Sequence, residues 1–240
     1  MRMPTQQVEQ TYGPEGGHDN NSPENPAVWF QPIVDTANSR VFAYQCLFAN
    51  AAPKETQIAL RGIAAMRRSG IYFVDVSAAS PPPVAQSNLA RPHSIVCQLR
   101  LSDPGRQLHY LRRLKEIYSQ DKCDLALVAH DADSETLHAL AELQPTYIKL
   151  HQGLSRNVES PRCAEAIRKI TELADRHNLV VIAEGVRASV TLENLWLVGV
   201  RNMQGDFFGQ PAMSIFSKPP DFSDPSDFPQ NAHRRLVKPV

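Results

Sequence analysis

The chain has 240 residues and a hydrophobic share of 42%, and its 25 basic side chains balance its 25 acidic ones. This composition predicts a globular protein with a sizeable core, and the balanced charge gives no global field that would favour nucleic acid or an acidic membrane surface. No apolar run approaches the roughly 18 residues of a membrane span, and the N-terminus lacks the apolar core of a secretory signal.

The cysteines and the two ends of the chain complete the general description. The four cysteines are widely spaced, without a CxxC pair, and we expect buried thiols in a reducing, cytoplasmic compartment. Residues 1–26 are polar and rich in Gly, Pro and Asn, which predicts a disordered tail. Residues 217–240 form a Pro-rich extension whose short basic end is interpreted as solvated. Residues 27–216 are therefore expected to form the folded domain.

Eight short apolar or β-branched runs alternate with helical stretches between the tails. In chain order the predicted strands are VWFQPIV, VFAYQCLF, IYFVDVS, SIVCQLRL, DLALVA, TYIKL, LVVIAE and RNMQGDFF. This alternation predicts an α/β barrel or a doubly wound sheet. A barrel places its chemistry at the C-terminal ends of its strands, so the residues there are the candidates for function.

Two of the helical stretches have a clear apolar stripe. In PGRQLHYLRRLKEIYSQ the predicted stripe is Leu108, Leu111, Leu114 and Ile117. In SPRCAEAIRKITELADRHN it is Ala164, Ile167, Ile170 and Leu173, with Ser160 and Pro161 opening the helix and Asn178 closing it.

Three segments at the strand ends resemble a known family. FQPIVD, YIKL and VIAEGV followed by NMQGDFFGQP are similar to the YQPIVD, YLKID-like and AEGVE…QGYYFGRP segments of the EAL family of cyclic di-GMP phosphodiesterases. The resemblance spans roughly residues 27 to 213 in the same order. It implies a TIM-like (β/α)8 barrel with an antiparallel first strand, in which carboxylates hold Mg²⁺ or Mn²⁺ for hydrolysis of the dinucleotide.

The resemblance also shows where this chain departs from the family. Seven positions at which the family carries an acid or an asparagine align with Gln45, Asp75, Gln98, Val128, Ala129, His151 and Glu184. Only Asp75 and Glu184 still offer a carboxylate, and the arginine that contacts a phosphate in the family aligns with Ala49. The paired aspartates of the family align with Val128 and Ala129, and Asp131 and Asp133, which follow them, are expected in a loop. We therefore expect no Mg²⁺ or Mn²⁺ site, no catalytic residues and no hydrolysis.

His151 and Glu184 need separate interpretations. His151 could bind zinc together with Asp75 and Glu184. Lys149 would lie close by and repel the cation, so the interpretation of His151 as a hydrogen-bonded pocket residue is favoured. Glu184 is expected to face Lys149 or the edge of a purine.

The candidate cyclic di-GMP pocket combines the strand-end residues that the family uses around its ligand. Its members are Gln31, Pro32, Gln45, Leu47, Asp75, Ser77, Lys149, Glu184, Gly185, Gln204, Phe208 and Pro211. The alternative is that these residues serve turns and packing in the barrel, and the sequence leaves the choice open.

Three functions are compatible with these residues. The first is a non-catalytic signalling protein that regulates by binding a protein partner. The second is a receptor that binds cyclic di-GMP without metal or cleavage, and the third is an active phosphodiesterase. The sequence does not give the partner, the direction of regulation or the oligomeric state.

Overall fold

A computed structural model describes residues 28–48, 70–76, 93–101, 104–120 and 123–212 of the chain. The expected terminal segments 1–26 and 217–240 lie outside these residues, and so do Ser77 and Ala49.

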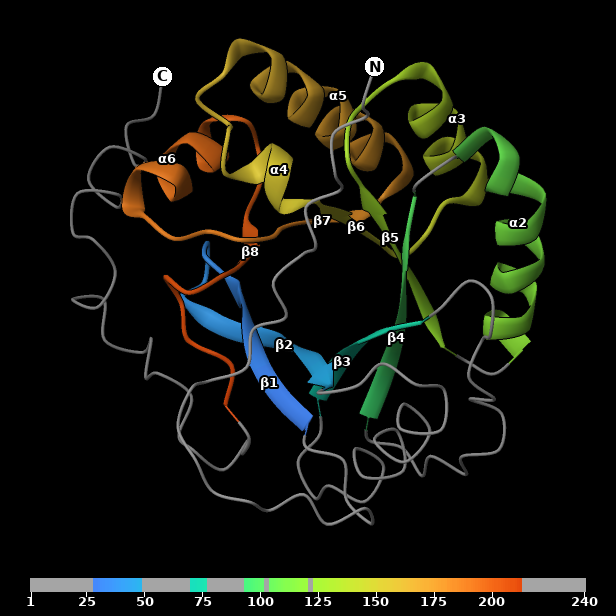
Figure 1. The fold of residues 1–240 in the computed structure, drawn as a ribbon, viewed down its shortest axis with the longest axis horizontal. Helices are drawn as coiled ribbons and strands as arrows, with labels where there is room; N and C mark the ends of the chain where they lie inside the picture. The colour runs from blue at the N-terminus through green and yellow to red at the C-terminus, as the bar shows by residue number, and fades with distance from the viewer. Residues whose placement is uncertain (1–27, 49–69, 77–92, 102–103, 121–122, 213–240) are drawn as a thin grey trace, which may run out of the picture.

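Eight strands close into a barrel in chain order (Figure 1). They are β1 (Val28–Asp35), β2 (Arg40–Phe48), β3 (Gly70–Asp75), β4 (His93–Arg100), β5 (Asp124–Ala129), β6 (Tyr147–Leu150), β7 (Val180–Ala183) and β8 (Asn202–Gln204). Strand β1 runs antiparallel to both of its neighbours, β2 and β8, and the other neighbouring pairs are parallel. The predicted barrel with an antiparallel first strand is confirmed.

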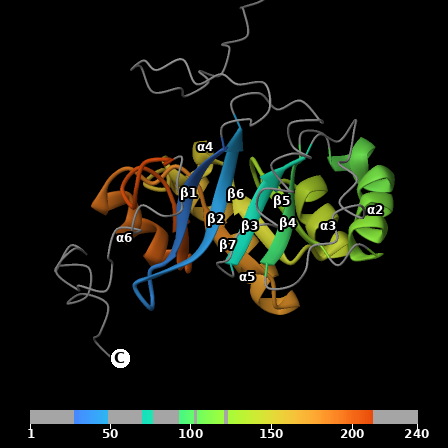
Figure 2. The same ribbon diagram turned by 90° about the horizontal axis from the view of Figure 1, so that it is seen from below.

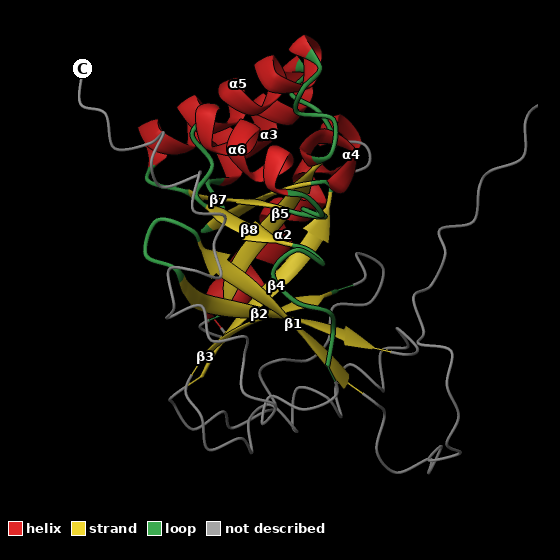
Figure 3. Cartoon of the chain, turned by 90° about the vertical axis from the view of Figure 1, so that its left-hand side faces the viewer, coloured by secondary structure: helices red, strands yellow, loops and turns green. Residues whose placement is uncertain are grey.

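The described helices cover the outside of one part of the barrel. They are α2 (Pro104–Gln120), α3 (Ser134–Leu143), α4 (Gln152–Ser155), α5 (Pro161–His177) and α6 (Ser189–Leu197). Figures 2 and 3 show them gathered around the later strands, with β1, β2 and β3 on the side away from them. None of the described helices is both long and apolar enough to cross a bilayer.

The two predicted helices form, with one correction to a stripe. Helix α5 begins after Ser160, and it ends at Asn178 in a left-handed conformation with φ 56°, as expected. In α2, however, Ile117 is 38% exposed, and Tyr118 is buried with 1% exposed. A helix turns every 3.6 residues, so a stripe continued in steps of three drifts around the helix, whereas Tyr118 lies two full turns beyond Leu111.

Apolar side chains pack in two layers, inside and outside the strands. The inner cluster contains one residue from each of seven strands: Ile33, Ala43, Phe73, Val96, Ala126, Tyr147 and Ile182. The outer cluster lies between the strands and the helices and includes the buried stripe of α5. Alternate residues of a strand point to opposite faces, so each of these seven strands supplies both clusters. The core therefore does not depend on the polar residues at the strand ends.

The cysteines only partly match their prediction. Cys46 and Cys97 are buried as expected, whereas Cys123 and Cys163 are half-buried, so the prediction of burial is wrong for these two. All four are free thiols.

Gly205 joins the end of β8 to the loop that follows β7. The Val186 amide donates to the Gln204 carbonyl, and the Phe207 amide donates to the Val186 carbonyl, at 3.0 and 3.1 Å. A Cβ atom on Gly205 would lie 2.1 Å from the Val186 oxygen and 2.4 Å from its nitrogen. Since both are backbone atoms, only a glycine fits here without moving one of the loops.

Replacing Gly205 with alanine is therefore expected to lower the free energy of unfolding by about 3 kcal/mol. Gly199→Ala is the matched control: Gly199 also has a positive φ, of 92°, but its nearest neighbour would lie 3.7 Å from the added Cβ. It should cost about 1 kcal/mol. Urea denaturation of both variants measures the difference, and equal losses would contradict the role of the Val186 contact.

Candidate functional site

A ring of side chains closes the barrel at the C-terminal ends of its parallel strands. The alternation of the strands places on the inner face one residue per strand, two positions beyond the layer of the inner cluster. We call these residues the mouth ring: Gln31, Gln45, Asp75, Gln98, Val128, Lys149, Glu184 and Gln204. All of them except Val128 are polar.

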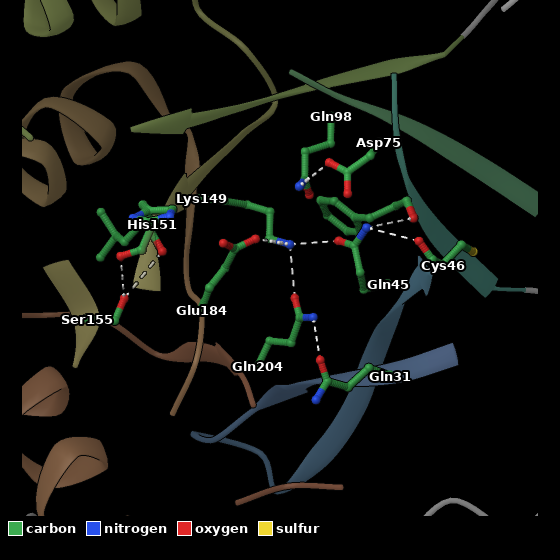
Figure 4. A network of polar contacts seen from close by, with 12 residues as sticks. Gln31, Gln45, Cys46, Asp75, Gln98, Lys149, His151, Ser155, Glu184 and Gln204 are labelled. Atoms are coloured by element: carbon green, nitrogen blue, oxygen red, sulfur yellow. Dashed lines mark hydrogen bonds and ion pairs between the residues drawn. The ribbon is translucent and has the colours of Figure 1, made fainter. Parts of the chain in front are cut away.

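Lys149 occupies the centre of the mouth ring (Figure 4). Its side chain is 0% exposed, and its ammonium group pairs with Glu184 Oε1 at 2.7 Å. The same group donates to Gln45 Oε1 at 2.7 Å and to Gln204 Oε1 at 2.9 Å. It also lies 5.4 Å from the centre of the Phe73 ring. An ammonium group has three N–H donors, and here all three are directed to oxygen atoms of the ring.

The orientation of three glutamine side chains follows from this ammonium group. Gln45 and Gln204 turn their oxygens toward Lys149, so their NH₂ groups point away from it and need acceptors. Gln204 Nε2 donates to Gln31 Oε1 at 2.8 Å. Gln31 Nε2 in turn donates to the Gly209 carbonyl at 3.2 Å. The amide of Gln45 contacts backbone carbonyls of β2 and β3. Each amide is therefore held at both ends.

Asp75 and Gln98 form a separate corner of the mouth ring, on the neighbouring strands β3 and β4. Gln98 Nε2 donates to Asp75 Oδ1 at 2.7 Å. The other end of this amide, Gln98 Oε1, is buried and has no hydrogen-bond partner. Burial raises the pKa of the Asp75 carboxyl, and Lys149 and Arg100 oppose that rise. Burial likewise raises the pKa of the Cys46 thiol, which keeps it protonated and unreactive.

The two residues that align with the family's paired aspartates are apolar and buried. Val128 and Ala129 are both 0% exposed at the end of β5. Asp131 and Asp133 lie in the following loop, as predicted, and both serve the start of α3. Asp133 accepts the Thr136 amide at 2.7 Å, and Asp131 accepts the Thr136 hydroxyl at 3.1 Å.

His151 lies beside the mouth ring and belongs to the start of α4. Its Nδ1 accepts the Gly153 amide at 3.1 Å, and its ring centre lies 4.1 Å from that of His130. The expected hydrogen-bonded histidine is confirmed. Among the residues that the structure describes, no group of three or more His, Cys, Asp or Glu side chains could hold a metal ion.

The predicted pocket residues divide into two groups. Those that converge around Lys149 or on the adjoining corner are Gln31, Gln45, Asp75, Glu184 and Gln204. The others lie elsewhere: Pro32 alternates with Gln31 and so points away from the barrel interior. Leu47 pairs with Trp29 further along β2. Gly185 and Pro211 lie in the loops after β7 and β8.

Phe208 is part of the hydrophobic core in this structure. Its side chain is 2% exposed and belongs to the outer cluster, packed edge to face against Phe207. The hypothesis that its ring flanks a guanine stays a prediction, because no ligand is present. It would require the ring to leave this packing.

Gln98 and Phe73 complete the site and were not among the predicted pocket residues. A count of alternating positions along β3 and β4 would have placed both on the inner face. The hydrogen bond between Gln98 and Asp75 could not have been found in this way, since it depends on which strands are neighbours.

The sequence model of the family described as the EAL domain matches residues 83–211, more than half of the chain. This chain belongs to the EAL domain family. A search of curated proteins finds no match.

Solved structures support the fold of this EAL domain. BlrP1 of Klebsiella pneumoniae, in a complex with calcium and cyclic di-GMP, aligns with a TM-score of 0.67 and 20% identity over 79% of this chain. The chain spans 57% of the length of BlrP1. The EAL domain of Xanthomonas citri FimX, in complex with cyclic di-GMP, aligns with a TM-score of 0.64 and 16% identity. The alignment covers 80% of this chain and 90% of the FimX domain. The EAL domain of Mycobacterium smegmatis DcpA aligns with a TM-score of 0.66 and 17% identity. The alignment covers 78% of this chain and 92% of the DcpA domain.

Removing the central cation should strongly destabilise the barrel. Lys149→Met keeps most of the length of the side chain but leaves Glu184 unpaired and two amide oxygens without a donor. We expect a loss of about 3–5 kcal/mol in the free energy of unfolding, measured with urea. The double variant Lys149→Met/Glu184→Gln should recover part of the loss, because no unpaired charge remains.

Lys169→Met provides the control for that experiment, since Lys169 lies on the exposed face of α5. It should change stability by less than about 0.5 kcal/mol. A similarly small effect of Lys149→Met would show that the ammonium group is not needed to hold the mouth ring.

Asp75→Asn should stabilise the protein at neutral pH, because an asparagine amide can pair reciprocally with Gln98 and donate to its unpartnered oxygen. The gain expected from that hydrogen bond is about 1 kcal/mol. The folded state binds the Asp75 proton more tightly than the unfolded chain does, so the wild type loses stability as pH rises from 3.8 through the raised pKa. The advantage of Asp75→Asn should grow over this range and then level off.

Denaturation curves at several pH values, compared with Asp175→Asn on the exposed face of α5, test this expectation. An advantage that is the same at every pH, or that shrinks as pH rises, would contradict it.

Proposed function

We propose that this EAL domain is a non-catalytic regulatory module that acts through a protein partner and does not hydrolyse cyclic di-GMP. The observation that carries the proposal is the state of Lys149. Its buried ammonium group stands at the centre of the mouth ring and takes up the carboxylate of Glu184 at 2.7 Å. An internal cation thus engages one of the two carboxylates that remain from the family's ligand set.

The remaining donors do not fit Mg²⁺ or Mn²⁺. These ions need several oxygen ligands around one point, normally with more than one carboxylate. Here the oxygens of Gln45 and Gln204 are turned to Lys149, and Val128 presents a methyl surface. Asp75 is the carboxylate of the ring that is left, and the amide nitrogen of Gln98 is directed at it. A divalent ion would meet an ammonium group where it needs oxygen ligands.

The second candidate function is a receptor that binds cyclic di-GMP without cleaving it. BlrP1 and the FimX EAL domain were solved in complexes with cyclic di-GMP, which favours this candidate. The charges of the mouth ring oppose it, because Lys149 is matched by Glu184 and Asp75 adds a further negative charge. A ligand with two phosphates would find no unmatched cation within the ring itself.

Regulation through protein contacts is the function that remains when the chemistry of the mouth ring is altered and the barrel is kept. Five of the seven positions where the family carries an acid or an asparagine hold neither in this chain, which supports it. Helix α6 also exposes Val190 and Leu197, at 49% and 73%, although single exposed apolar residues are common on protein surfaces.

Calorimetric titration of the full chain with cyclic di-GMP, with and without Mn²⁺, followed by a product assay, tests the proposal. We expect no hydrolysis product with or without Mn²⁺, and no saturable heat of binding for cyclic di-GMP. A catalytically active EAL domain run in parallel shows that the assay works. Product that forms with Mn²⁺ and is lost in Glu184→Ala would overturn the non-catalytic function.

Saturable heat without product would instead favour the receptor. Gln31→Ala is then the informative variant, because Gln31 lies at the mouth and its amide ends the chain of hydrogen bonds from Lys149. Phe208→Ala would be ambiguous, since truncation of a core side chain also destabilises the fold.

A further inference from the structure

The hydrogen bonds of the mouth ring are complete around Lys149 and incomplete at the corner formed by Asp75 and Gln98. These two residues are register partners on β3 and β4, so their side chains leave the sheet side by side on the inner face. Figure 4 shows them next to the centre of the ring, with their polar ends directed inward.

The corner holds more acceptor oxygens than the described residues supply with donors. Gln98 uses its NH₂ group on Asp75 Oδ1 at 2.7 Å, and its oxygen is buried without a partner although the residue is only 2% exposed. Among the described residues, the Asp75 carboxylate receives no other hydrogen bond. A buried acceptor without a donor costs about 1–3 kcal/mol, so a group that supplies N–H donors here would be stabilised.

The charge of the corner points to a cationic donor. Glu184 is neutralised by direct contact with Lys149, whereas Asp75 makes no ion pair within the described part of the chain. Lys149 and Arg100 act on Asp75 from a distance, and the net effect of its surroundings is still a raised pKa, with burial as the largest cause. A cation in contact with Asp75 would offset that desolvation.

We propose that this corner binds a guanidinium group, of the kind that an arginine side chain of a protein partner presents. A guanidinium group carries several N–H donors in one plane, which suits acceptor oxygens supplied by two register partners on neighbouring strands. The assignment rests on the proposed function, because a barrel that loaded a divalent cation on Asp75 would leave no place for the arginine.

Methylguanidinium is a suitable probe, and the full chain is titrated with it while the side-chain amide of Gln98 and the carboxyl carbon of Asp75 are followed by NMR. We expect saturable shifts of both signals with a dissociation constant on the order of millimolar, as for a small fragment. Tetramethylammonium has the same charge without N–H donors and should shift neither signal. Equal shifts with the two cations would overturn the proposal.

Asp75→Asn should weaken binding of methylguanidinium at least about ten-fold, since the loss of a charged partner removes more than a neutral hydrogen bond contributes. The introduced amide also supplies its own donor to Gln98. Asp175→Asn, which changes an exposed acid on α5, should bind as the wild type does. Undiminished binding in Asp75→Asn would overturn the proposal.

Two further outcomes separate this proposal from the non-catalytic function. Absence of any saturable shift, together with absence of hydrolysis, overturns the guanidinium site and leaves the non-catalytic function standing. Paramagnetic broadening of the Asp75 and Gln98 signals by Mn²⁺, with product formed from cyclic di-GMP, overturns both.

Discussion

The contact between the Lys149 ammonium group and its three oxygen partners is the interaction on which the arrangement of the barrel mouth depends. A charge buried this completely must be matched by an opposite charge and by hydrogen bonds, or it would strongly disfavour folding. Glu184 supplies the charge, while Gln45 and Gln204 supply neutral oxygens. Strands β2, β6 and β8 and the residue that follows β7 meet in this one group.

The same contact sets the direction of hydrogen-bond donation in the mouth ring. Because the ammonium group only donates, every amide next to it turns its oxygen inward and its NH₂ group outward. The chain of donors passes from Lys149 through Gln204 to Gln31 and ends on the Gly209 carbonyl. The glutamines are thus members of an ordered network. Only the corner of Asp75 and Gln98 lies outside this order, and there an acceptor is left without a donor.

The apolar core of the fold is built from residues other than those of the mouth ring. The inner cluster fills the barrel below the mouth ring, and the outer cluster packs the strands against the helices. Neither cluster needs an acid at the strand ends. An EAL barrel can therefore keep its shape while the chemistry of its mouth changes from carboxylates to amides, a valine and a buried ion pair. This separation is compatible with membership of the family in a chain whose mouth ring carries Gln45, Gln98 and Val128.

The sequence by itself determined the places of the eight strands, the closing of α5 at Asn178 and the family, because these follow from local periodicity and from motifs at fixed spacing. The last predicted strand, RNMQGDFF, is too long, since β8 ends at Gln204 and the chain turns from Gly205 onward. The sequence also gives the side chain that stands at each strand end. Only the tertiary structure decided which polar groups meet: Lys149 contacts residues that lie 104 and 55 positions away along the chain. The sequence left open whether Glu184 faces Lys149 or a purine. The ion pair with Lys149 and the burial of Phe208 both depend on the closure of the barrel. Closure brings together strand ends that are far apart in sequence, and a local sequence pattern does not predict which of them come into contact.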